Sequence, residues 1–130
     1  MQILFYNSAA RRIKVKMLIV DDDAKSITLL EDLLRLRNIE VLKASNGRDA
    51  LALLTPELKC CFIDIRLPDM SGSVVARRIR EKYAAMCLVA YTASVLSNEK
   101  DELIRSNLFD AVLLKPLKLE EFEKVMTALE

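Results

Sequence analysis

Three apolar runs in this chain end abruptly at a charged residue, and this pattern limits the folds available to the sequence. Such continuous runs are typical of strands buried on both faces, as in a parallel sheet covered by helices. The carboxyl ends of parallel strands gather at one edge of the sheet, and ligands bind there. The runs Leu18–Val20, Cys60–Ile63 and Val112–Leu114 are followed by Asp21, Asp64 and Lys115. We therefore expect these three charged side chains to share one edge of a sheet.

Short apolar segments and amphipathic segments alternate five times along the chain. Strands are expected at residues 13–20, 40–44, 60–63, 87–91 and 111–114, and helices at 24–37, 46–54, 73–83, 97–107 and 119–129. Strict alternation over short connections predicts an α/β fold, a five-stranded parallel sheet with helices on both faces. Right-handed crossovers leave few topologies, and the flavodoxin-like strand order 2-1-3-4-5 is the commonest at this size. That order makes the first and third strands neighbours.

The length of 130 residues and the apolar content of 52% fit one globular domain with one core. We divide the chain into residues 1–13, a leader or an extra strand, and residues 14–130, the domain. No apolar run is long enough to cross a bilayer and the start lacks a signal-peptide pattern, so we expect a cytoplasmic protein without membrane insertion. The net charge of +1 gives no general footprint for nucleic acid.

The chain contains three cysteines, Cys60, Cys61 and Cys87, all in or beside apolar runs. Adjacent Cys60 and Cys61 should point to opposite faces of a strand. We interpret the three as small buried apolar side chains in a reducing compartment. A metal site built from cysteine is not expected, because the chain has no histidine and no Cys-x-x-Cys spacing.

Asp21, Asp22 and Asp64 should converge at the edge between the first and third strands. Two carboxylates about 4 Å apart repel by roughly 4 kcal/mol at an effective dielectric constant near 20, so a compensating cation is expected. A few hard oxygen ligands with room for water suit Mg²⁺, whereas the glycine turn and terminal glutamate of an EF-hand loop are missing. The run Asp21–Asp23 has a second interpretation, in which these acids only cap the helix that follows.

Other polar groups follow the neighbouring strands. Lys115 supplies a positive charge for an anion, Thr92 a hydroxyl, and Ala93 a main-chain amide. Carboxylates, a metal, a lysine and a hydroxyl are the components needed to accept a phosphoryl group, because that chemistry depends on positioning and charge neutralisation. Asp64 would then be the nucleophile and form an acyl phosphate.

These residues resemble the motifs of the response-regulator receiver domains of two-component signalling, over about residues 14–130. The matching segments are Leu18–Asp23, Asp64–Gly72, Tyr91–Ala93 and Leu114–Pro116. The resemblance implies that Asp64 is the phosphoacceptor, that Asp22 binds Mg²⁺ directly and Asp21 through water, and that the main-chain carbonyl of Arg66 completes the coordination. It also implies that Thr92, Ala93 and Lys115 bind the phosphoryl oxygens, and that the Lys115–Pro116 bond is cis.

The resemblance further implies a histidine kinase or a histidine phosphotransfer domain as donor. It implies a protein target that docks on the face formed by the helix at 97–107, the strand at 111–114 and the helix at 119–129, and it leaves a homodimer open. Self-phosphorylation is expected rather than turnover of an external substrate. Family members commonly carry Tyr or Phe three residues before the lysine, where this chain has Val112. Arg66 lies two positions after Asp64, where a long cation could shield the phosphoryl group from water.

The sequence leaves two alternative functions open. A phosphatase of the haloacid-dehalogenase type would use Asp21 as nucleophile and Asp23 as its partner, but Lys25 stands where its threonine is expected. A receiver fold could also serve only as a docking module that is independent of phosphorylation.

Overall fold

The structure, a computed structural model, describes residues 14–93 and 97–130. Its elements are β1 (Lys16–Val20), α2 (Ala24–Leu36), β2 (Glu40–Ala44), α3 (Gly47–Ala52), β3 (Leu58–Ile63), α4 (Gly72–Lys82), β4 (Cys87–Ala93), α5 (Ser97–Arg105), β5 (Ala111–Lys115) and α6 (Leu119–Leu129). The strands form one parallel sheet in the order β2-β1-β3-β4-β5, which confirms the predicted topology. The proposed leader or extra strand at residues 1–13 lies outside the described residues.

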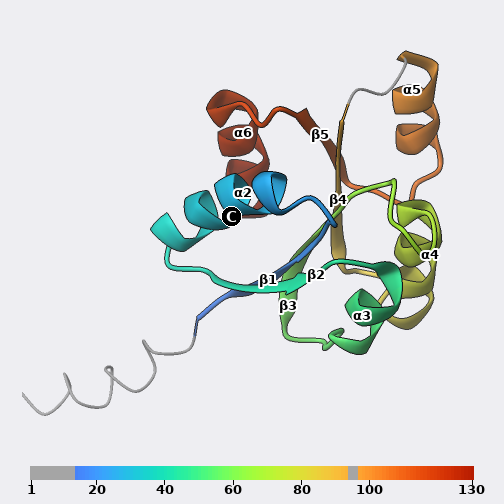
Figure 1. The fold of residues 1–130 in the computed structure, drawn as a ribbon, viewed down its shortest axis with the longest axis horizontal. Helices are drawn as coiled ribbons and strands as arrows, with labels where there is room; N and C mark the ends of the chain where they lie inside the picture. The colour runs from blue at the N-terminus through green and yellow to red at the C-terminus, as the bar shows by residue number, and fades with distance from the viewer. Residues whose placement is uncertain (1–13, 94–96) are drawn as a thin grey trace, which may run out of the picture.

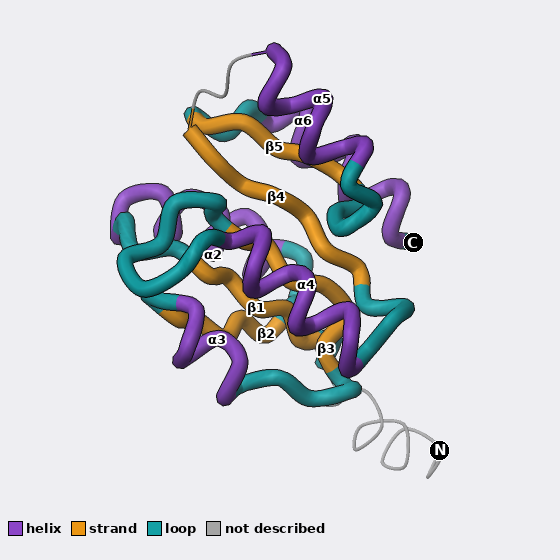
Figure 2. The backbone as a smooth tube through the Cα atoms, turned by 90° about the vertical axis from the view of Figure 1, so that its right-hand side faces the viewer, coloured by secondary structure: helices purple, strands orange, loops and turns teal. Residues whose placement is uncertain are grey.

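Two layers of helices cover the sheet, as predicted. Helices α2 and α6 lie on one face, and α3, α4 and α5 lie on the other (Figure 1). In Figure 2 the second group lies in front of the strands. Each face has its own buried cluster, centred on Leu30, Leu34 and Phe122 on the first side and on Val75, Ile79 and Leu88 on the second. No helix in the described part of the chain is both long and apolar enough to span a bilayer.

Successive residues of each central strand belong alternately to the two core clusters. Cys60 and Phe62 pack toward α2 and α6, whereas Cys61 and Ile63 pack toward the other helices. The predicted opposite orientation of Cys60 and Cys61 is therefore confirmed. Both faces of the central strands are buried, which explains why their sequences are continuous apolar runs rather than alternating patterns.

Several element boundaries differ from the predicted ones. The third strand starts at Leu58 rather than Cys60, because Leu58 is buried and pairs with β1 while Lys59 points to solvent. The fourth strand continues to Ala93, since the polar Thr92 also pairs with β5. Helix α3 ends at Ala52, and the amide of Leu53 bonds back to Asp49 and Ala50. Main-chain pairing thus carries the strands beyond their apolar runs.

Helix ends follow local chemistry. Ser71 accepts a hydrogen bond from Ser73 N and caps α4, and Asn46 caps α3 through Asp49 N. After α2 the chain turns at Asn38, whose φ of 62° lies in the left-handed region that asparagine tolerates. The turn comes just after the end of the helix that the sequence predicts at residues 24–37.

Candidate functional site

The acids Asp21 and Asp64 follow paired strand ends. Val20 and Ile63 are register partners in β1 and β3, so the next residue of each strand lies at the same edge. Main-chain bonds continue the ladder one step further, from Asp64 N to Val20 O at 2.8 Å and from Asp21 N to Ala44 O at 2.9 Å. The backbone that carries both carboxylates is therefore fixed by the sheet itself.

Three carboxylates converge at this edge. One oxygen each of Asp21, Asp22 and Asp64 lies within 4.8 Å of the others. Asp21 is fully buried and Asp64 is 7% exposed, whereas Asp22 is exposed. The predicted convergence is confirmed, and solvent or a ligand can reach the cluster at the exposed Asp22.

Asp23 does not join this cluster. Its carboxylate accepts hydrogen bonds from Lys25 N at 3.1 Å and Ser26 Oγ at 3.0 Å, and it forms the N-cap of α2. These bonds lower the pKa of Asp23. The helix-capping interpretation therefore holds for the third acid of the run, while the first two acids reach the cluster.

Lys115, at the end of β5, places its amine among the buried acids. Its Nζ lies 2.6 Å from Asp21 Oδ2 and 3.2 Å from Asp64 Oδ2, and the side chain is only 12% exposed. Burial alone would lower the pKa of this lysine, but the two carboxylates outweigh it and the pKa rises. The amine also lies 5.1 Å from the centre of the Tyr91 ring, a cation–π distance. The Lys115 ammonium group is thus kept charged, and it contacts the two carboxylates and the Tyr91 ring.

Asp21 is the carboxylate of the cluster whose charged form is most disfavoured by burial. Burial raises its pKa, although Lys115 and the amide of Asp23 oppose that effect. Its Oδ2 forms an ion pair with Lys115 but no well-aligned hydrogen bond among the described residues. Three carboxylates and one amine together carry a net negative charge. The buried Asp21 Oδ2 can also accept a further ligand. These features fit a hard divalent cation.

Thr92 and Ala93 complete the edge at the end of β4. Thr92 is 1% exposed, and Ala93 is the register partner of Lys115. Thr92 also lines a pocket of about 370 Å³ that includes Ile65, Arg66 and residues of α4 and α5. Ala93 therefore lies next to Lys115 on the neighbouring strand, whereas Thr92 pairs with Leu114 and has open space on the side of α5.

The loop after Asp64 is tightly built. The amide of Arg66 donates to Asp64 Oδ1 at 3.2 Å, and Gly72 N donates to Ile65 O at 2.7 Å. A side chain at position 72 would overlap the backbone of Asp64 and Ile65, so only glycine fits there. The side chain of Arg66 is exposed. The structure thus orients one Asp64 oxygen through the loop and the other through Lys115.

Two site-related residues were not identified from the sequence. Asp69 accepts hydrogen bonds from Gly47 N at 2.8 Å and Arg48 N at 2.9 Å, which ties the loop to the start of α3. Tyr91 precedes Thr92 in β4 and packs with α2 and α6. Its contact with Lys115 depends on the register of β4 and β5, for which the sequence carries no signal. The cis Lys115–Pro116 bond was expected and is present.

The chain matches the model of the response regulator receiver domain over residues 17–127. It is 30% identical over 120 residues to the hybrid signal transduction histidine kinase L of Dictyostelium discoideum, covering 85% of this chain and 7% of that protein. It is also 30% identical over 112 residues to the sensor histidine kinase RcsC of Escherichia coli, covering 85% of this chain and 12% of that protein. The chain thus spans a small part of these curated relatives.

Solved structures show the same fold. The response regulator TrrA of Thermotoga maritima, in complex with Mg²⁺-BeF, is 26% identical with a TM-score of 0.77, covering 89% of this chain and 99% of that one. A CheY-like receiver domain protein of Methanospirillum hungatei is 25% identical with a TM-score of 0.78, covering 90% and 94%. Together with the family match and the edge of acids, lysine and threonine, these likenesses show that the chain belongs to the receiver domains of two-component signalling.

Proposed function

We propose that Asp64 is the phosphoacceptor of this receiver domain, and that it takes a phosphoryl group from a phosphohistidine in the presence of Mg²⁺. The observation that carries the proposal is the convergence of Asp21, Asp22 and Asp64 within 4.8 Å, with the Lys115 amine 3.2 Å from Asp64. A nucleophilic carboxylate that sits beside a fixed cation and spare metal-binding oxygens has the parts that phosphoryl transfer needs.

In the transfer, an Asp64 oxygen attacks phosphorus as the bond between phosphorus and the donor imidazole nitrogen breaks, and the imidazole leaves with that electron pair. Lys115 is already within 3.2 Å of Asp64 and would pair with a phosphoryl oxygen. The Thr92 hydroxyl and the Ala93 amide would donate to the others. Each of these groups neutralises charge on the transferred oxygens without changing its own covalent state.

Mg²⁺ would supply positive charge that is shared between the carboxylates and a phosphoryl oxygen. We assign Asp22 as a direct ligand, because it is the exposed member of the cluster, and Asp21 as a ligand that acts through water. The main-chain carbonyl of Arg66 is assigned as the remaining ligand from the protein, on the basis of the family resemblance.

The donor proposed for this chain is a histidine kinase or a histidine phosphotransfer domain, since its relatives are histidine kinases. The proposed output surface is the face of α5, β5 and α6, where Ile104, Leu114 and Leu119 are 53%, 39% and 60% exposed. This face would also hold a homodimer. Val112 replaces the usual aromatic residue, so a shift of Thr92 would remodel this face without a ring that swings inward.

The three cysteines are free thiols, which are typical of proteins in a reducing compartment, and we propose that this protein is located in the cytoplasm.

Incubation with Mg²⁺ and a small acyl phosphate, followed by mass spectrometry, tests the assignment. The wild type should gain one phosphoryl group on the peptide that contains Asp64, and Asp64→Asn should gain none. Asp23→Asn is the matched control, because asparagine retains the cap of α2 and the cluster is untouched.

Labelling of Asp21 instead of Asp64 would favour the phosphatase alternative. A folded wild type that takes no label would favour a docking module that is independent of phosphorylation. Labelling of Asp64→Asn as readily as the wild type would contradict the assignment of the nucleophile.

A further inference from the structure

Cys60 and Cys87 lie side by side on neighbouring strands. They are register partners in β3 and β4, and both pack on the face of the sheet that α2 and α6 cover. All three cysteines of the chain are free thiols, and Cys61 lies on the opposite face. Cys60 and Cys87 therefore form a dithiol that the phosphorylation chemistry does not use.

This dithiol lies at the end of the sheet away from Asp64. Cys60 precedes Asp64 by four residues, which corresponds to about 13 Å along a strand. Cys87 is the first residue of β4, whereas Thr92 lies near its end. The pair is thus separate from the edge that holds the acids.

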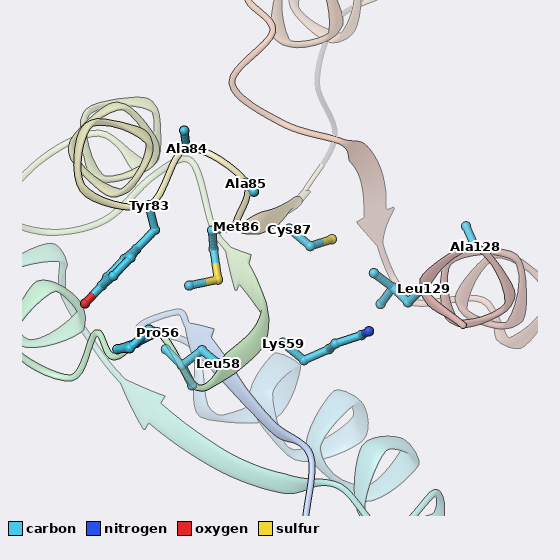
Figure 3. Close-up of a pocket in the computed structure, with 10 residues that line it drawn as sticks. All are labelled: Pro56, Leu58, Lys59, Tyr83, Ala84, Ala85, Met86, Cys87, Ala128 and Leu129. Atoms are coloured by element: carbon cyan, nitrogen blue, oxygen red, sulfur yellow. The ribbon is translucent and has the colours of Figure 1, made fainter.

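One thiol of the pair is accessible and the other is buried. Cys60 is fully buried, but Cys87 is partly exposed and lines a pocket of about 580 Å³ (Figure 3). Lys59, Met86 and Leu129 also line this pocket, between the starts of β3 and β4 and the end of α6. A small reagent can therefore reach Cys87, while Cys60 is accessible only through its partner.

The surroundings favour reaction at Cys87. The neighbouring Cys60 thiol lowers the pKa of Cys87, and Arg80 and Lys59 add to that effect, although burial and Asp110 oppose it. The thiolate is the reactive form of cysteine, so a lowered pKa increases its reactivity at neutral pH. By contrast, burial raises the pKa of Cys61 to about 12, which makes that thiol inert.

We propose that Cys60 and Cys87 form a peroxide-reactive dithiol, in which Cys87 is oxidised first and Cys60 then closes an intramolecular disulfide. Neighbouring strands lie about 4.7–4.9 Å apart, within the range of about 4.4–6.8 Å that separates the Cα atoms of bridged cysteines. Both side chains leave the sheet on the same face, so the bridge needs no change of register. Attack of an external thiolate on one of its sulfur atoms would reopen such a bridge.

The chemistry balances with hydrogen peroxide as the oxidant. The Cys87 thiolate attacks one peroxide oxygen, the O–O bond breaks, and a sulfenic acid and hydroxide form, the latter leaving as water after it takes a proton. The Cys60 sulfur then attacks the Cys87 sulfur, the S–O bond breaks, and the thiol proton leaves with hydroxide as a second water. Two thiols lose two electrons and two protons in all, and one peroxide becomes two waters.

Peroxide treatment of the folded protein, followed by mass spectrometry, tests the proposal. The protein should lose the mass of two hydrogen atoms and regain it with a dithiol reductant. Trypsin leaves Cys60 and Cys61 on one peptide, residues 60–66, so the experiment is repeated in Cys61→Ala, where a link to residues 83–100 can come only from Cys60. If Cys61→Ala does not fold, fragmentation of the linked wild-type peptide between residues 60 and 61 gives the same answer.

Three further results decide the order of events. Cys60→Ala should stop at a sulfenic acid on Cys87 that a dimedone probe traps, and Cys87→Ala should leave Cys60 unmodified. Alkylation of Cys87 in the folded wild type should be at least about tenfold faster than that of Cys61. Failure to lose two hydrogens, a link from Cys61, or crosslinks between chains on a non-reducing gel would each overturn the proposal.

Discussion

Replacing Lys115 with methionine should lower the free energy of unfolding by about 3 kcal/mol in metal-free buffer at pH 7. The amine lies 2.6 Å from Asp21 Oδ2 and 3.2 Å from Asp64 Oδ2, and it is the cation that offsets these buried acids. Methionine keeps most of the length and the apolar stem of lysine but leaves the carboxylates facing one another. The decrease in the free energy of unfolding therefore measures how much the Lys115 cation stabilises the two buried carboxylates.

The magnitude follows from the distances. At an effective dielectric constant of 20 the two attractions are roughly 6 and 5 kcal/mol. The cost of burying the ammonium group cancels much of this sum, and removal of one partner from a buried pair costs about 3–5 kcal/mol in practice. We take the lower end, because the lysine side chain retains 12% exposure.

The assay is urea unfolding of the variant against the wild type, with Lys118→Met as control. Lys118 is exposed and makes no side-chain hydrogen bond to the start of α6, so its loss should cost less than about 0.5 kcal/mol. Added Mg²⁺ should recover more stability in Lys115→Met than in the wild type, because it offsets a larger uncompensated charge. Equal losses in the two variants would refute the reasoning.

The deficit should also depend on pH. Burial raises the pKa of Asp21 above its ordinary value of 3.8, so folding favours its protonated form. Such a group stabilises the fold fully below 3.8 and loses that contribution as pH rises through the folded value. Without Lys115 the pKa of Asp21 should rise further, so the deficit of the variant should be largest at neutral pH and shrink in acid. A deficit that is constant with pH would contradict this account.

Three further predictions concern neighbouring residues. Asp22→Asn should abolish the stabilisation by Mg²⁺ with little change in metal-free stability, whereas Asp23→Asn should retain it, as measured by unfolding with and without the ion. Gly72→Ala should cost about 2 kcal/mol or more in thermal or urea unfolding, because its Cβ would overlap the backbone of Asp64. Arg66→Ala should accelerate hydrolysis of the acyl phosphate if the exposed guanidinium shields it from water, and an unchanged rate would contradict that role.

Apolar patterning was sufficient to predict the order of elements, the parallel sheet and the edge at which the site forms. The reason is physical, because strands buried on both faces must be continuously apolar and their ends must meet at one edge. The apolar pattern could not predict which role each individual aspartate has. Asp22 and Asp23 are identical in type and adjacent, yet one reaches the carboxylate cluster and the other caps α2. That difference arises from the backbone at the strand end, which the pattern does not encode.

Strand register is the other quantity that patterning left open, and it decides which side chains meet. Cys60 and Cys61 are equally good partners for Cys87 by composition, and Tyr91 could contact any residue near the end of β5. Because side chains alternate between faces, a slip of one residue between β3 and β4 would turn the side chains of β4 to the opposite face and pair Cys87 with Lys59 or Cys61. The observed pairing of Cys60 with Cys87, and of Ala93 with Lys115, is therefore a consequence of the ladder. If peroxide links residue 60 rather than 61 to residue 87, chemistry in solution will have measured that register directly.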